Sequence, residues 1–188
     1  MIDAKITHSG RIVWAAALAL AILAGPAQAQ AVADAGKLIA ATPPKPFPEL
    51  TLTDLDKEEP ANLSAYKGKP IIVNLWATWC GPCLEEMPSL MKLNAALKDQ
   101  VAIVAIAEDR GGKFQVDPFL KEHNIQGLTI YLDKTSSTVK ALKNPPLPTT
   151  VLIDAQGNEV GRVVGARDWA SAESQAEIAK LLGLKPPA

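Results

Sequence analysis

The chain has little of what disulfide-stapled or metal-binding frameworks need, because only two of its 188 residues are cysteine and only two are histidine. The cysteines lie three positions apart rather than spread along the chain, which excludes a framework of stapling disulfides. A closed zinc site needs four ligands, and His8 and His123 are both far from the cysteines in sequence. The sequence therefore predicts chemistry at a cysteine pair, without a resident metal or cofactor.

Charge is also sparse and balanced. The net charge is -1 and there is no dense block of Lys or Arg, so neither a nucleic-acid surface nor a polybasic membrane patch is indicated. The apolar fraction of 48% is unlike that of a disordered chain. A length of 188 residues suits one domain with a terminal extension. We expect a monomer whose partners are proteins or small thiols.

Residues 1–29 have the order of a targeting segment. Lys5 and Arg11 precede an uncharged run over 12–24, and a small-x-small cleavage site follows at 25–29. The apolar run is shorter than the roughly 18 residues that comfortably span a bilayer. A cleaved signal peptide and an uncleaved membrane anchor are therefore alternatives. Both predict export to the periplasm, as a soluble protein or tethered to the inner membrane.

Residues 30–48 are rich in Ala and then in Pro, which predicts an extended linker and places the folded domain at 49–185. The clearest patterns in that domain are strands at 70–77, 101–107 and 128–132, helices at 84–97, 114–123 and 169–182, and a hairpin at 149–164. This alternation predicts an α/β fold with a mixed central sheet flanked by helices on both faces.

The residues from Trp79 to Cys83 read Trp-Cys-Gly-Pro-Cys, directly after the first buried strand and at the start of a helix. Two cysteines with this spacing lie on one helix face, within reach of a disulfide. Cys80 meets unpaired N–H groups and the positive end of the helix dipole, which favour its thiolate. We predict that Cys80 attacks a substrate disulfide and that Cys83, one turn inside the helix, resolves the mixed disulfide.

The two residues between the cysteines suit this chemistry. Pro82 fits the first turn of a helix, and Gly81 lets a partner chain approach closely. An inert structural disulfide is the less favoured alternative, because so short a loop removes little entropy from the unfolded chain.

The segment 73–83, the Glu-Glu-Met-Pro run at 85–88 and the Leu-Pro-Thr-Thr run at 147–150 resemble the thioredoxin superfamily, and within it the TlpA/ResA-like branch of periplasmic thiol-disulfide oxidoreductases. The resemblance covers roughly residues 47–182 and implies a thioredoxin-like fold. It also implies that Pro148 is cis and lies against the reactive pair, and that Leu147 pairs with the incoming peptide. A trans proline that merely starts a strand is the alternative.

Trp79 is expected either to shield the disulfide or to contact the substrate together with Gly81 and Pro82. Glu86, three residues after Cys83, matches the position at which ResA-like proteins carry a functional acidic residue. A carboxyl group partly buried there would have a raised pKa and exchange a proton with Cys83. The alternative is a solvated glutamate that suits the helix dipole.

The sequence departs from that of cytoplasmic thioredoxins in the strand before the cysteine motif. Cytoplasmic thioredoxins carry a buried Asp where this chain has Asn74, so their proton relay is absent in that form.

The resemblance implies a reductase of envelope clients in cytochrome c or cytochrome oxidase biogenesis, recharged by a membrane electron donor of the DsbD/CcdA type. The Gly-Pro dipeptide is that of thioredoxin, whose potential is about -270 mV, whereas the oxidant DsbA lies at about -120 mV. A disulfide-introducing oxidase remains an alternative. A copper-binding chaperone is less favoured, since Met87 is the only His or Met near the pair. A peroxidase would need a peroxidatic cysteine at another position.

Overall fold

The structure is a computed structural model that describes residues 34–97 and 99–185. The predicted targeting segment, residues 1–29, lies outside the described residues. In the described ranges, no helix is long and apolar enough to cross a membrane.

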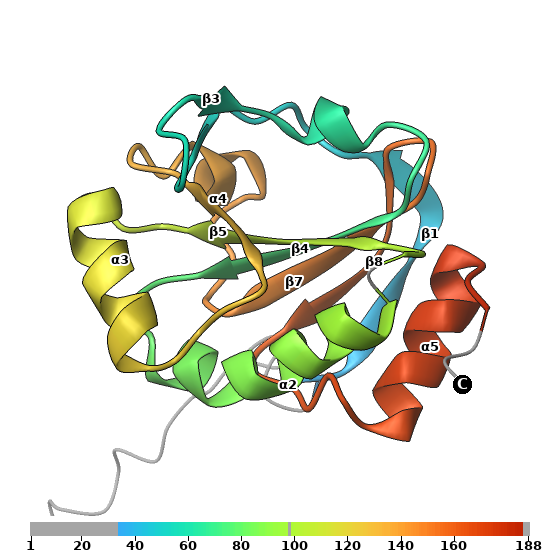
Figure 1. Ribbon diagram of the computed structural model, residues 1–188. Helices are drawn as coiled ribbons and strands as arrows, with labels where there is room; N and C mark the ends of the chain where they lie inside the picture. The colour runs from blue at the N-terminus through green and yellow to red at the C-terminus, as the bar shows by residue number, and fades with distance from the viewer. Residues whose placement is uncertain (1–33, 98, 186–188) are drawn as a thin grey trace, which may run out of the picture. The chain divides into compact units, whose positions relative to one another are not determined.

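A mixed sheet lies at the centre of the structure (Figure 1). Within the described residues it has eight strands in the order β1-β8-β7-β4-β5-β6-β2-β3. The strands are β1 Leu38–Pro46, β2 Leu52–Asp54, β3 Pro60–Ala61, β4 Ile71–Trp76, β5 Ala102–Ala107, β6 Thr129–Leu132, β7 Thr149–Ile153 and β8 Asn158–Val164. Strands β4, β5 and β6 are parallel, and β7 runs antiparallel to β4 and β8.

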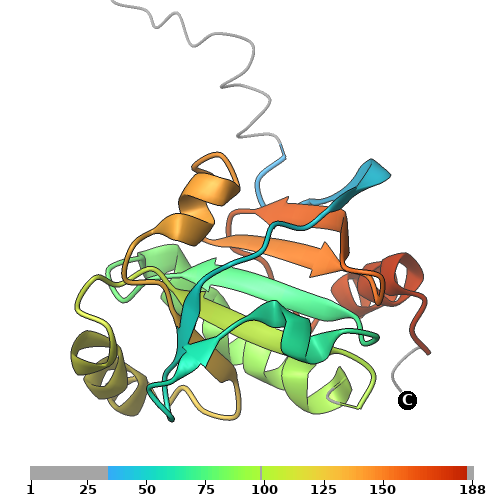
Figure 2. The same ribbon diagram turned by 90° about the horizontal axis from the view of Figure 1, so that it is seen from above.

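Helices cover both faces of this sheet, as expected. They are the 3-10 helix η1 Leu63–Tyr66 and the α-helices α2 Gly81–Leu97, α3 Lys113–Glu122, α4 Ser137–Ala141 and α5 Ala172–Leu182. Side chains of α2, α3 and α5 pack on one face, and those of η1 and α4 pack on the other. The view in Figure 2 shows β1 beside β8 toward one edge of the sheet and β2 with β3 toward the other.

Strand β4 separates the two hydrophobic cores, and all six of its side chains are buried. Successive side chains of a strand point to opposite faces. Ile72, Asn74 and Trp76 face α2, whereas Ile71, Val73 and Leu75 face η1 and α4. Burial on both faces explains why this strand reads as a nearly continuous apolar run.

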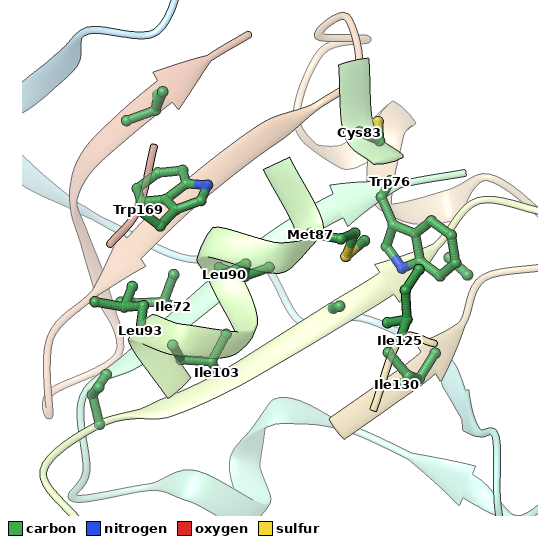
Figure 3. Close-up of a cluster of buried hydrophobic side chains, with 14 of the residues drawn as sticks. Ile72, Trp76, Cys83, Met87, Leu90, Leu93, Ile103, Ile125, Ile130 and Trp169 are labelled. Atoms are coloured by element: carbon green, nitrogen blue, oxygen red, sulfur yellow. The ribbon is translucent and has the colours of Figure 1, made fainter. Parts of the chain in front are cut away.

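Figure 3 shows the core on the α2 side, with Trp76 and Trp169 on opposite sides of the helix. Met87, Leu90 and Leu93 of α2 are fully buried there. Each such side chain contributes about 1.5–3 kcal/mol through removal of apolar surface from water. The middle of α2 is therefore held firmly against the sheet.

The carboxyl ends of the three parallel strands lie at one edge of the sheet. The backbone N–H of Glu108 donates to the Trp76 carbonyl at 2.9 Å, and that of Asp133 donates to the Ala107 carbonyl at 2.9 Å. These bonds hold the segments after β4, β5 and β6 side by side. Open α/β sheets bind their ligands at such an edge.

The predicted linker over residues 30–48 is wrong for residues 38–46, which form strand β1. Strand β1 pairs antiparallel with β8, beginning with Leu38 opposite Val163. Its register shifts between Ala40 and Lys45. An edge strand accepts proline because its outward N–H groups need no partner in the sheet. A Pro-rich composition therefore does not by itself exclude a strand.

The predicted helix over 169–182 begins three residues later, at Ala172, as α5. Ser171 caps it, its side chain accepting a hydrogen bond from the N–H of Ser174. Gly183 ends it in the left-handed conformation, with φ of 64°. Trp169 thus lies in the segment before the helix.

We predict that removing β1 destabilises the fold. A chain that begins at Glu49 leaves β8 as an exposed edge and loses the packing of Leu38, which we expect to cost about 2 kcal/mol. For a domain of this size the melting temperature should fall by about 4–8 °C relative to a chain that begins at Asp34. Calorimetry of both oxidised chains measures this. Equal melting temperatures would return residues 38–46 to the role of a linker.

Candidate active site

Cys80 and Cys83 form a disulfide at the N-terminus of α2, with a Cα–Cα distance of 5.3 Å. Helix α2 begins at Gly81, and Pro82 occupies its first turn, where a missing N–H costs no hydrogen bond. The backbone N–H of Cys83 donates to Sγ of Cys80 at 3.3 Å. When the pair is reduced, this donor and the helix dipole favour negative charge on Cys80.

The two cysteines differ in their access to solvent. Cys80 is 6% exposed and Cys83 is fully buried, while Gly81 and Pro82 between them are exposed. An approaching disulfide meets Cys80 first. This difference favours Cys80 as the attacking sulfur and Cys83 as the resolving one.

The two tryptophans of the motif have opposite environments. Trp76 is fully buried and its ring packs on Phe119, with the centroids 5.8 Å apart. Trp79 is 69% exposed. Trp76 fills the core, and Trp79 presents most of its surface to solvent beside the disulfide.

Asp109 holds the loop that leads into the motif. Its carboxylate accepts from the backbone N–H of Thr78 at 3.0 Å and from the Thr78 hydroxyl at 2.7 Å. The amide of Gln115, at the start of α3, donates to both Asp109 and Thr78 at 2.7 Å. Asp109 is buried, so this network fixes the loop two residues before Cys80.

The Leu147–Pro148 peptide bond is cis, as the resemblance implied. Thr149, the next residue, pairs with Leu75 near the carboxyl end of β4. The carbonyl of Pro148 accepts from the N–H of Gly165 at 2.9 Å. Pro148 is buried, and Leu147 is partly buried against both cores. Leu147 and Pro148 therefore lie beside the carboxyl end of β4, the strand that precedes the cysteine pair.

Glu86 is buried, contrary to the alternative of a solvated glutamate. Its Oε1 accepts from Nδ2 of Asn74 at 2.8 Å. Its Oε2 accepts from the indole N–H of Trp169 at 2.9 Å and from the backbone N–H of Arg167 at 3.1 Å. The carboxyl group joins β4, α2 and the segment before α5.

Burial raises the pKa of Glu86 from 4.5 to about 7, because the charged form loses its hydration. The hydrogen bonds from Trp169, Asn74 and the Arg167 backbone favour the carboxylate and act in the opposite direction. The guanidinium of Arg167 is occupied elsewhere, by Ser174 and Glu177. Glu86 is thus poised to change protonation near neutral pH.

Glu86 and Cys83 share a buried face of α2, one turn apart. Asn74, at the position where cytoplasmic thioredoxins carry Asp, donates to Glu86 and to the hydroxyl of Thr150 at 2.9 Å. Asn74 of β4 therefore holds the carboxyl group of Glu86, which α2 supplies. Within the described part of the chain, Oδ1 of Asn74 is buried and has no hydrogen-bond partner.

Two acidic residues near the site, Glu108 and Asp109, were not predicted from the sequence. They directly follow the carboxyl end of β5. Glu108 is buried, and among the described residues neither of its carboxylate oxygens has a hydrogen-bond partner. Burial, together with the charges of Asp133 and Asp109, raises the pKa of Glu108 to about 8. The signal available in the sequence was the position of both carboxyl groups directly after the predicted buried strand at 101–107.

Trp169, in the segment before α5, is fully buried. It also donates its indole N–H to Glu86. The 83 positions that separate the two residues leave no local pattern to reveal this bond.

No group of three or more His, Cys, Asp or Glu side chains that could hold a metal ion occurs in residues 34–97 and 99–185.

A family model described as Redoxin matches residues 42–180, which is most of the chain and includes every site residue described above. The chain belongs to the redoxin family. ResA, a thiol-disulfide oxidoreductase of Bacillus cereus, is 33% identical over 122 residues, covering 64% of this chain and 69% of ResA.

Solved structures agree with this assignment. A DsbE-type thiol:disulfide interchange protein from Chlorobium tepidum superposes with a TM-score of 0.64 at 26% identity, covering 73% of this chain and 96% of that one. A secreted disulfide oxidoreductase of Mycobacterium tuberculosis, homologous to Escherichia coli DsbE, has a TM-score of 0.52 at 27% identity, covering 60% and 81%. This redoxin has the thioredoxin-like fold, and its cysteine pair is that of a thiol-disulfide oxidoreductase of the ResA/DsbE type.

We predict that Glu86 makes the stability of the oxidised redoxin depend on pH. Below pH 4.5 the group is protonated in both the folded and unfolded states. As pH rises from 4.5 to about 7, the unfolded chain ionises while the folded chain keeps its proton. The free energy of unfolding should fall across this window by about 3 kcal/mol and then level off.

Urea unfolding of wild type and Glu86→Gln from pH 4 to pH 8 isolates this effect, because other groups titrate equally in both. The exposed neighbour Glu85 offers the control substitution Glu85→Gln. A difference between wild type and Glu86→Gln that stays constant across the window would contradict the assignment.

Proposed function

We propose that this redoxin is an exported reductase that breaks disulfides in envelope client proteins. The observation that carries the proposal is the arrangement at the start of α2. Cys80, the more exposed of the two cysteines, accepts a backbone N–H, and the fully buried Cys83 lies one turn before a buried carboxyl group of raised pKa. This arrangement supplies an attacking thiolate, a resolving thiol and a nearby proton carrier.

Reduction takes place in two exchanges. The Cys80 thiolate attacks one sulfur of the client disulfide, forms a mixed disulfide and releases the other client sulfur as a thiolate. The Cys83 thiolate then attacks Sγ of Cys80, and the second client sulfur leaves. Two electrons have passed to the client, which takes up two protons to become a dithiol, and Cys80 and Cys83 are again a disulfide.

Glu86 acts as the proton carrier for Cys83. Cys83 must lose its proton before it attacks, and the carboxylate of Glu86 on the same buried face accepts it. A protonated Glu86 needs an acceptor for its new O–H. The buried Oδ1 of Asn74 is suited to this, since a half-turn of the amide directs it to Glu86 and to the Thr150 hydroxyl.

Export is supported by the targeting pattern at 1–29 and by the M. tuberculosis relative, which is secreted. In an oxidising compartment a reductase needs electrons from outside it, and a membrane donor of the DsbD/CcdA type is the proposed source. The proposed clients are apocytochrome c or proteins of cytochrome oxidase assembly, whose cysteines must be reduced before haem or copper is attached.

We predict that Cys83→Ser traps a mixed disulfide between Cys80 and a client, because the resolving thiol is missing. Cys80→Ser should trap nothing. The test is non-reducing electrophoresis after the reduced variants react with a disulfide-bonded apocytochrome c. A trapped adduct with Cys80→Ser, and none with Cys83→Ser, would reverse the assigned order of attack.

We further predict that Glu86→Gln shifts the pH profile of thiol alkylation to lower pH. Above pH 7 the wild-type carboxylate is ionised and opposes a thiolate on Cys83, and the amide removes that opposition. Reduction of the client at pH 7 should nevertheless slow by at least about tenfold, because the proton acceptor is gone.

The same measurements on Glu85→Gln provide the control, since that side chain is exposed. Superimposable alkylation profiles for wild type and Glu86→Gln would remove Glu86 from the mechanism.

A further inference from the structure

Large apolar side chains are rarely exposed on this redoxin. In the described residues they are Ile39 at 52%, Trp79 at 69% and Phe114 at 92% exposed. Single exposed apolar residues are ordinary and need no explanation. Their location is informative, because Trp79 and Phe114 each adjoin a residue of the network beside the disulfide.

The two aromatic residues are joined through their sequence neighbours. Gln115 follows Phe114, Thr78 precedes Trp79, and the Gln115 amide donates to the Thr78 hydroxyl at 2.7 Å. The first turn of α3 therefore lies against the loop that leads to Cys80. Phe114 and Trp79 are therefore two exposed rings whose chain neighbours are bonded to each other, and we call this pair the aromatic platform.

Phe114 does not take part in packing α3 against the hydrophobic core. Val116 is fully buried, and Phe119 packs on Trp76. Lys113 pairs with Asp117 at 2.9 Å. These contacts account for the inner face and one flank of the helix, and the phenyl ring of Phe114 is left in solvent. Its apolar surface is free to be buried by another molecule.

The platform is held in place before any substrate arrives. Asp109 accepts from both the backbone N–H and the hydroxyl of Thr78, and Gln115 donates to the same carboxylate. A surface that is already ordered loses little conformational entropy on binding. Trp79 and Phe114 therefore meet a partner from a fixed loop and a fixed helix end.

We propose that the aromatic platform binds the client polypeptide beside its disulfide and selects a segment with an aliphatic or aromatic side chain next to the attacked cysteine. This rests on the proposed reductase function. A disulfide attacked by Cys80 brings its own chain across the residues that adjoin Cys80, so the platform continues the surface on which the exchange takes place. Trp79 is part of the motif, and Phe114 is the added specificity-determining residue.

Two model peptides with one internal disulfide each, differing only in Leu or Ser next to the attacked cysteine, test this proposal. Wild type should reduce the Leu peptide with a kcat/KM about five- to tenfold above that for the Ser peptide. Phe114→Ser should lose most of this preference through a higher KM. Phe114→Leu should retain it. Oxidised glutathione offers no apolar side chain, so Phe114→Ser should lower its reduction much less than it lowers reduction of the Leu peptide.

Ile39→Ser is the matched control, because Ile39 is also an exposed apolar residue. It lies on β1, an edge strand that is separated from β4, the strand before the motif, by β8 and β7. It should keep the wild-type preference. Equal kcat/KM for both peptides in wild type, or an unchanged preference in Phe114→Ser, would overturn the proposal. Failure of wild type to reduce either peptide or oxidised glutathione would instead overturn the reductase function.

Two other occupants of the platform give distinct results. Sedimentation of wild type and Phe114→Ser tests a second copy of the chain, and flotation with anionic vesicles tests a lipid surface. Association that depends on Phe114 in either assay, without a peptide preference, would assign the platform to that occupant and contradict the client proposal.

Discussion

The burial of one carboxyl group, that of Glu86, connects the fold of this redoxin to its chemistry. A carboxylate in an apolar interior is costly unless hydrogen bonds replace its hydration. Asn74 from β4, the Trp169 indole and the Arg167 backbone supply those bonds from two other parts of the chain. They hold the first turns of α2 against the sheet and keep the pKa of Glu86 near neutrality.

The central part of the fold was predictable because local and global signals agree there. Strand β4, within the apolar run at 70–77, is buried on both faces. The cysteine motif that follows opens a helix, as predicted from Pro82 and from the helix dipole at Cys80. The two sulfurs are bonded, and the Leu147–Pro148 bond is cis. These features depend on residues close together in sequence, or on the resemblance of short motifs.

The rest could not be read from the sequence because it depends on distant partners. A Pro-rich segment becomes strand β1 only because β8 offers it an edge. Glu86 is buried among partners that include Trp169, which lies 83 positions away in the sequence. The acidic pair Glu108 and Asp109 reaches the site because β5 runs parallel to β4, and a strand's neighbours are not visible in its own residues.

In the proposed function electrons leave the cysteine pair toward clients, and the reduction potential of the Cys80–Cys83 couple decides whether they can. Equilibration of the redoxin domain with glutathione or dithiothreitol buffers at pH 7, followed by thiol quantitation, gives this value. We expect a potential near that of thioredoxin, about -270 mV, in keeping with the Gly81-Pro82 dipeptide. A potential near that of DsbA, about -120 mV, would contradict it and make the protein an oxidant.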